Sequence, residues 1–72
     1  MGEEEYRRLA TRLGAALRRR RQNLGLTQEE IANDLGMVTR RYQTIEAGEQ
    51  NLTLKTLSRL AKTLRIAVKD LF

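Results

Sequence analysis

The sequence predicts an all-α protein, a compact five-helix domain without a strand. Apolar residues recur at three- and four-residue steps along most of the chain, which is the period of an amphipathic helix. Glycines and helix-capping residues separate these apolar segments, and the chain contains no proline. A chain of 72 residues has room for one domain only, so residues 1–72 are interpreted as a single unit.

The first predicted helix runs from about Glu3 to Gln22. Glutamates stand at its start and arginines near its end, an arrangement that the helix dipole favours. Gly25 follows, where the left-handed backbone conformation of a helix end is easiest for glycine. Residues 1–5 are expected either to extend this helix or to be disordered.

The second predicted helix is short and runs from Gln28 to Leu35. Thr27 precedes it and Glu30 lies three residues later, which is the pattern of a capping box. In that motif the hydroxyl accepts from an unpaired backbone amide, while the carboxylate reaches back to the cap residue. Gly36 ends this helix.

The third predicted helix runs from Thr39 to Ala47, and Gly48 closes it. Val38, Tyr42 and Ile45 recur at helical spacing and are expected to face the core.

The last part of the chain is predicted to contain a fourth helix, capped by Thr53, and one further helical turn at residues 66–72. The apolar face of the fourth helix is expected to consist of Leu54, Leu57, Leu60, Ala61 and Leu64.

The composition argues against most enzyme classes. The chain has no cysteine and no histidine, so it lacks the usual zinc ligands, nucleophile and general base. We therefore expect no enzyme, no cofactor and no metal site. Lys and Arg total 14 against 9 for Asp and Glu, and the net charge of +5 favours a polyanionic partner, although it also aids solubility. The sequence has no long apolar run and an acidic start, so we expect a cytoplasmic, nucleoid-associated protein.

Residues 28–47 meet the geometric demands of two short helices that cross at a steep angle. A small residue must lie where the helices approach most closely, and a glycine eases the tight turn between them. Ala32 and Gly36 stand at these two positions. The inside of the corner is filled by the apolar residues Ile31, Leu35, Met37, Tyr42 and Ile45.

On these residues the chain resembles the helix-turn-helix of the lambda-repressor-like family, the Cro and phage-repressor (XRE) type. The likeness runs without a gap from about Leu13 to Phe72 and includes LRRRRQNLGLTQEEIANDLG, IEAGEQNLTLKTLSRLAKTL and KDLF. The resemblance implies a domain that reads double-stranded DNA in the major groove, usually as a homodimer on a palindromic operator.

Candidate base-reading residues lie on the outer face of the third helix. If the core stripe points inward, Arg40, Gln43 and Thr44 point outward, with Thr39 and Arg41 on the flanks. Arginine can pair with guanine, glutamine with adenine, and threonine can pack its methyl group on thymine. On an isolated helix such residues would be ordinary solvated surface. The resemblance assigns base contacts to Thr39, Arg40 and Thr44, and leaves Arg41 and Gln43 to contact bases or phosphates.

Phosphate contacts are expected at helix ends. The second helix begins with free backbone amides beside Thr27 and Gln28, and the resemblance matches Gln28 to a glutamine that contacts the DNA backbone. The alternative for Gln28 is a plain helix-start residue. The resemblance also brings Asn51, Thr53 and Lys55 to the other side of the groove.

The arginine run at residues 18–21 could be read as a localisation or heparin-binding patch. However, four consecutive residues of a helix span all its faces and cannot form one basic stripe. Leu17 and Leu24 place Arg21 near the buried side of the first helix. The resemblance implies that Arg21 pairs with Glu46 and holds the third helix to the first.

Four positions depart from the family pattern. Val38 stands where Ser or Thr usually caps the third helix, so Thr39 is expected to cap it instead. Tyr42 replaces an aliphatic residue, and its hydroxyl needs a protein partner, water or the DNA backbone. Leu52 stands where Pro is common, and Arg65 stands where Gly often ends the fourth helix.

The apolar C-terminus is the candidate dimer interface, formed by Ile66, Val68, Leu71 and Phe72. The alternative is that Leu71 and Phe72 fold back onto the first helix, and we expect these residues to share both roles.

The expected biological role is that of a repressor or autoregulator of the restriction–modification controller, phage-repressor or antitoxin type. The alternative is a protein-interaction module with the same fold, such as an antitoxin whose main partner is a toxin. RNA binding is less well supported, because the few aromatic residues lie at core-like positions.

Overall fold

The computed structural model describes residues 2–49 and 52–72. Within these ranges the chain forms four α-helices, α1 (Glu3–Asn23), α2 (Gln28–Leu35), α3 (Thr39–Glu46) and α4 (Leu54–Thr63). They are followed by a single 3-10 turn, η1 (Val68–Leu71). The described part is all-helical, as predicted, but the expected fifth helix is this turn of 4 residues. A segment so short closes 3-10 hydrogen bonds and does not continue as an α-helix.

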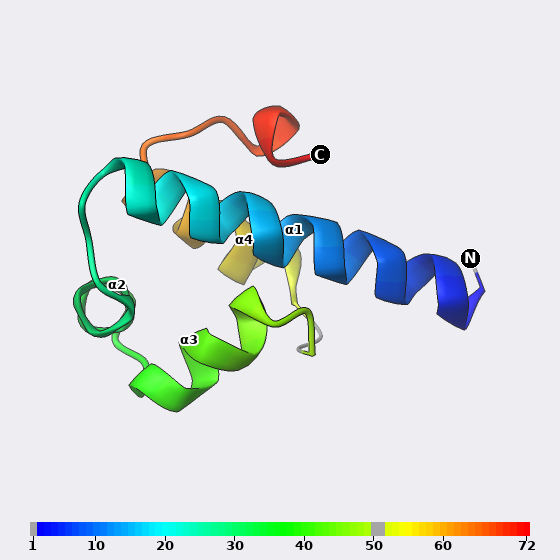
Figure 1. The fold of residues 1–72 in the computed structure, drawn as a ribbon, viewed down its shortest axis with the longest axis horizontal. Helices are drawn as coiled ribbons and strands as arrows, with labels where there is room; N and C mark the ends of the chain where they lie inside the picture. Colours follow the sequence, from blue (N-terminus) through cyan, green and yellow to red (C-terminus); the bar gives the residue numbers. More distant parts are fainter. Residues whose placement is uncertain (1, 50–51) are drawn as a thin grey trace.

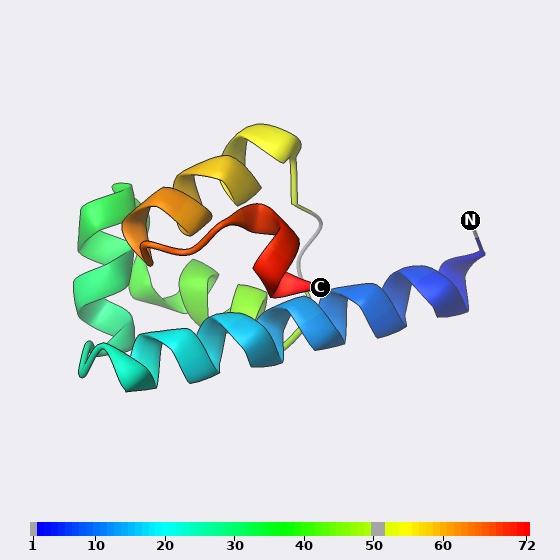
Figure 2. The ribbon, with the colours of Figure 1, turned by 90° about the horizontal axis from the view of Figure 1, so that it is seen from above.

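Helix α1 runs along the length of the molecule, and its N-terminal end projects beyond the other elements (Figure 1). Helix α3 packs against one side of α1 and η1 packs against another (Figure 1). Seen from above, η1 lies between α4 and α1 (Figure 2). This arrangement leaves the outer face of α3 away from the rest of the protein.

A single apolar cluster joins all the elements. Tyr42 is the largest of its completely buried side chains. The cluster consists of Leu13, Leu17, Ile31, Ala32, Leu35, Tyr42, Ile45, Leu60, Ala61, Leu64 and Leu71. Because α1, α2, α3, α4 and η1 all contribute to it, burial of these side chains orients α2 and α3 relative to each other.

Two residues that were predicted to face the core are exposed, so these two predictions are wrong. Val38 is 71% and Leu54 is 85% exposed. Val38 has an extended backbone before α3 begins, so the helical periodicity does not apply to it. Leu54 is the first residue of α4, and the helix turns into the core only beyond it.

Helix α4 ends without a glycine. Arg65 adopts a left-handed backbone conformation with φ of 55°, which is unfavourable for a residue with a side chain. The Arg20 guanidinium donates to the carbonyl oxygens of Leu64 at 2.8 Å and of Arg65 at 3.0 Å. Arg20 therefore satisfies carbonyls that the end of a helix leaves unpaired.

Candidate nucleic-acid interface

The corner between α2 and α3 is shaped by local interactions at both ends of α2. The capping box is formed: the Glu30 amide donates to the Thr27 hydroxyl at 3.1 Å, and the Thr27 amide donates to the Glu30 carboxylate at 2.9 Å. The hydrogen bond from the Thr27 backbone amide to the carboxylate is the main reason that the pKa of Glu30 is lowered. At the other end Gly36 adopts a left-handed conformation with φ of 68° and ψ of 30°, which ends α2 before the chain turns into α3.

Helix α3 lies unusually close to α1 at Gly14. A methyl group on Gly14 would approach the Ile45 carbonyl oxygen to 2.8 Å and overlap the Glu46 carbonyl. Only glycine permits this approach of two helix backbones. Gly14 was not among the residues predicted to be important, although a glycine inside an amphipathic helix is a recognisable signal of close packing.

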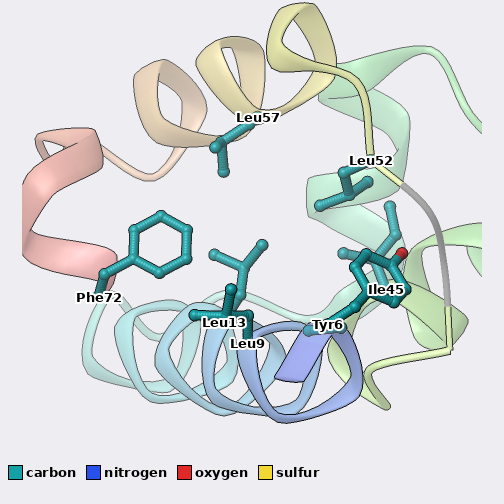
Figure 3. Close-up of a pocket in the computed structure, with 8 residues that line it drawn as sticks. Tyr6, Leu9, Leu13, Ile45, Leu52, Leu57 and Phe72 are labelled. Carbon is teal, nitrogen blue, oxygen red and sulfur yellow. The ribbon is translucent and has the colours of Figure 1, made fainter. Parts of the chain in front are cut away.

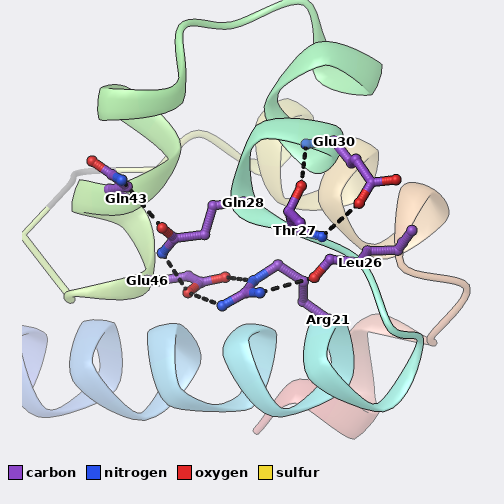
Figure 4. A network of polar contacts seen from close by, with 7 residues as sticks. All are labelled: Arg21, Leu26, Thr27, Gln28, Glu30, Gln43 and Glu46. Atoms are coloured by element: carbon purple, nitrogen blue, oxygen red, sulfur yellow. Dashed lines mark hydrogen bonds and ion pairs between the residues drawn. The ribbon is translucent and has the colours of Figure 1, made fainter.

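The same contact contains the ion pair between Arg21 and Glu46 (Figure 4). Arg21 Nε lies 2.7 Å from Glu46 Oε2, and Arg21 Nη2 lies 3.2 Å from Glu46 Oε1. The side chains are only 11% and 4% exposed, respectively. Arg21 Nη1 also donates to the Leu26 carbonyl at 2.9 Å, so this guanidinium links α1, α3 and the loop before α2.

The ionisation of both groups reflects this pairing. Burial would raise the pKa of Glu46, but the donors around it, Arg21 and Gln28 among them, outweigh burial and lower that pKa. The hydrogen bond to Glu46 raises the pKa of Arg21. Both groups are therefore charged at neutral pH, and each stabilises the other.

Tyr42 is completely buried beside this ion pair, so its hydroxyl does not reach DNA or solvent. It is close enough to Glu46 and Arg21 to affect their ionisation, yet it makes no hydrogen bond of acceptable geometry among the described residues. Burial raises the pKa of Tyr42. The hydroxyl therefore remains neutral, and no hydrogen bond within the described part of the chain offsets the free energy that is lost when it is removed from water.

Gln28, the first residue of α2, extends the network toward α3 (Figure 4). Its amide nitrogen donates to Glu46 Oε1 at 3.0 Å. Its amide oxygen accepts from Gln43 Nε2 at 3.2 Å. The residue expected to contact phosphate thus already makes two contacts inside the protein.

The outer face of α3 carries the candidate base-reading residues. Arg40, Arg41 and Gln43 are exposed, and Thr39 and Thr44 are half-buried. The Thr44 hydroxyl donates to the Arg41 carbonyl at 2.7 Å, so its proton is already used in a hydrogen bond within α3. Neither arginine has an ion pair within the described residues, so both guanidinium groups are available to a ligand.

The capping of α3 differs from expectation, although its first residue does not. Its N-cap is Val38 and its first residue is Thr39, so Thr39 does not cap the helix. Within the part of the chain that the structure describes, no side chain accepts a hydrogen bond from the free amides there. The helix begins as predicted, but its N-terminus has no side-chain cap.

The remaining candidate phosphate contacts have different surroundings. Thr27, Thr53 and Lys55 are exposed. The Thr53 oxygen accepts from the Thr56 amide at 3.1 Å and caps α4 as predicted. The Thr53 hydroxyl donates its hydrogen bond to the Thr56 hydroxyl at 3.0 Å. The donors that remain for a phosphate at the start of α4 are the Lys55 side chain and the backbone amides of the first turn before Thr56. Asn51 lies outside the described residues.

Arg59, like Arg20, has a structural role at a helix end that was not predicted from the sequence. Arg59 of α4 donates to the Leu35 carbonyl at 2.6 Å, at the end of α2. Together with Arg20, it shows that part of the positive charge is hydrogen-bonded to carbonyls at helix ends.

The C-terminal residues divide between core and surface. Leu71 is 2% exposed and belongs to the protomer core, whereas Val68 is 39% and Phe72 is 52% exposed. Ile66 is half-buried against the core. Phe72 also borders an apolar cavity of about 180 Å³ between α1, α4 and the segment before α4 (Figure 3).

Taken together, a steep two-helix corner and a basic outer face on its second helix define a helix-turn-helix protein. The helix-turn-helix family matches residues 17–71, and the chain belongs to this family, in its XRE or lambda-repressor-like branch. The chain is therefore a DNA-binding transcriptional regulator by family.

Solved structures of two regulators are similar to this chain. The restriction-modification controller protein C.AhdI from Aeromonas hydrophila is 32% identical, with a TM-score of 0.82 over 88% of this chain and 96% of that chain. The clp gene regulator ClgR from C. glutamicum is 28% identical, with a TM-score of 0.82 over 88% of this chain and 82% of that chain. A search of curated proteins gave no match. Among the helices of residues 2–49 and 52–72, none is long and apolar enough to cross a bilayer.

Proposed function

We propose that this protein is a dimeric, sequence-specific transcriptional repressor or autoregulator that reads a palindromic operator in the major groove. The observation that carries this proposal is the exposed face of α3, where Arg40 and Arg41 are free while α3 itself is held rigidly against α1. A groove reader needs both properties, because uncommitted side chains read bases and a fixed backbone limits the entropy lost on binding.

The residues proposed to read bases are Thr39, Arg40 and Thr44, with Arg41 and Gln43 contacting bases or phosphates. Phosphates are proposed to bind at the start of α2, at Thr27 and Gln28, and at Asn51, Thr53 and Lys55. Phosphate contacts orient the protein on the duplex, whereas base contacts determine the sequence that it prefers.

A dimer follows from the limited reach of one module, since a single recognition helix covers too few base pairs to compete with nonspecific sites. Two copies related by twofold symmetry would place their α3 helices about 34 Å apart on a palindrome. The exposed apolar residues Val68 and Phe72, with Ile66 beside them, are the proposed contact surface, and the buried Leu71 supports it from beneath. A chain that remains monomeric in light scattering at high concentration would contradict this part.

The similarity to C.AhdI favours a controller role over the other roles considered. C.AhdI is a controller protein of a restriction–modification system, and it matches this chain over nearly its whole length. We propose that this protein is a regulator of the same kind, and that it acts on DNA in the cytoplasm without a cofactor.

Selection of bound duplexes from a random pool tests the proposal. We expect a palindromic consensus, with an affinity that falls by about 0.9 log units per log unit of salt for each phosphate neutralised. Arg40→Ala should weaken binding by about 1–3 kcal/mol and relax the preference at one position of each half-site. Arg18→Ala is the matched control on the exposed surface of α1 and should leave that preference unchanged. If no sequence is enriched, the chain is instead a protein-interaction module with this fold.

A further inference from the structure

The polar network behind α3 orients one of its exposed side chains. Gln43 lies one helical turn beyond Arg40, so the two residues share the outer face of α3. A hydrogen bond favours one orientation of its amide, because Gln43 Nε2 donates to Gln28 Oε1 at 3.2 Å. Gln28 is in turn held by Glu46 at 3.0 Å.

The donor and acceptor properties of these groups permit one arrangement only. The Glu46 carboxylate is charged and accepts hydrogen bonds without donating any. Gln28 must therefore turn its amide nitrogen toward Glu46, which leaves its amide oxygen facing Gln43. That oxygen accepts only, so Gln43 must present its own nitrogen to it. The charge on Glu46 thus determines the orientation of two successive amides.

This orientation determines which atoms of the Gln43 amide face outward from α3. The Gln43 oxygen points away from Gln28 (Figure 4), and the second hydrogen of its amide nitrogen remains available. An outward amide edge with one acceptor and one donor matches the N6 amino group and N7 of adenine. Guanine and thymine present an acceptor where this oxygen requires a donor, so they are disfavoured.

We infer that Gln43 is a specificity-determining residue that selects adenine, and that Gln28 acts as a positioning residue by transmitting the orientation from Glu46. This inference rests on the proposed function and refines it, because it assigns a defined base to one exposed residue of α3 and gives Gln28 a positioning role in addition to its proposed phosphate contact. A glutamine amide that was free to flip would present either edge and would discriminate less well between bases.

The test compares three methionine variants of the full chain: Gln43→Met, Gln28→Met and Gln22→Met. Methionine keeps the length and helix preference of glutamine but has no amide. Gln22 is exposed on α1, outside the network, and provides the matched control. Each variant is first checked for wild-type helicity, and its affinity is then measured for operator duplexes that carry each of the four bases at each position of the half-site.

The wild-type protein and Gln22→Met should prefer adenine at one position by about tenfold or more. Gln43→Met should abolish that preference. Gln28→Met should reduce it nearly as far while leaving preferences at other positions unchanged, and the double variant should add nothing further.

Two results would overturn the inference while leaving the proposed function intact. If Gln28→Met weakens binding to all duplexes equally, Gln28 is a phosphate contact and does not orient Gln43. If Gln43→Met changes no base preference, Gln43 does not read the groove. If the initial selection enriches no sequence at all, the proposed function fails, and this inference fails with it.

Discussion

Replacement of Glu46 by alanine is the most informative stability measurement on this protein. The substitution removes three hydrogen bonds, two from Arg21 and one from Gln28, at a side chain that is only 4% exposed. Arg21 is left as a buried cation whose remaining partner is the Leu26 carbonyl. Alanine favours helix, so the loss reflects the broken network and not the backbone of α3.

The expected cost is about 3 kcal/mol. Breaking a buried ion pair from one side costs about 3–5 kcal/mol, and the remaining carbonyl partner of Arg21 places this case at the lower end. A chain of 72 residues has a total stability of about 4–11 kcal/mol, so the loss is a large fraction of it. At about 4–8 °C per kcal/mol for a domain of this size, the Tm should fall by about 12–24 °C.

Thermal unfolding followed by far-UV circular dichroism measures this effect, and Glu4→Ala provides the matched control. Glu4 pairs with Arg8 at 3.2 Å, but the two side chains are 82% and 70% exposed, so solvent screens the pair and its loss should barely change the Tm. If both variants melt alike, the Arg21–Glu46 pair does not hold α3 to α1, and the rigidity attributed to it is refuted.

Three further outcomes are expected. Gly14→Ala should destabilise the protein by about 1–3 kcal/mol, because its methyl group would overlap the Glu46 carbonyl; an unchanged denaturation midpoint would contradict the close approach of α1 and α3. Tyr42→Phe should leave the free energy of unfolding unchanged or raise it by up to about 1 kcal/mol, since it removes a buried hydroxyl without a partner; a loss would mean that this hydroxyl donates to Glu46. The lowered pKa of Glu46 contributes stability above the ordinary carboxyl value of 4.5 that is lost as the pH falls toward the folded-state pKa. The Tm of Glu46→Gln should therefore depend less on acid pH than that of the wild type, and equal dependence would contradict this.

The sequence by itself was sufficient for features that depend on neighbouring residues. The bounds of α2, its capping box at Thr27 and Glu30, and the left-handed turn at Gly36 were all predicted and are present. Caps and turns involve atoms only a few residues apart, so the residue types at fixed spacing are enough to specify them. The candidate readers Arg40 and Gln43 were placed on an outer face by helical periodicity alone, and both are exposed.

Only the tertiary structure decided the features that depend on which helices meet. Sequence periodicity placed Val38 and Leu54 in the core. Both are exposed, because Val38 precedes α3 and Leu54 is the first residue of α4, where the chain is still at the surface. The hydrogen bonds from Gln28 to Glu46 and from Gln43 to Gln28 join residues of α2 and α3, and no local sequence pattern predicts them. Contacts between distant segments arise when apolar burial brings helices together, and each polar side chain then binds whatever donor or acceptor the packing places beside it.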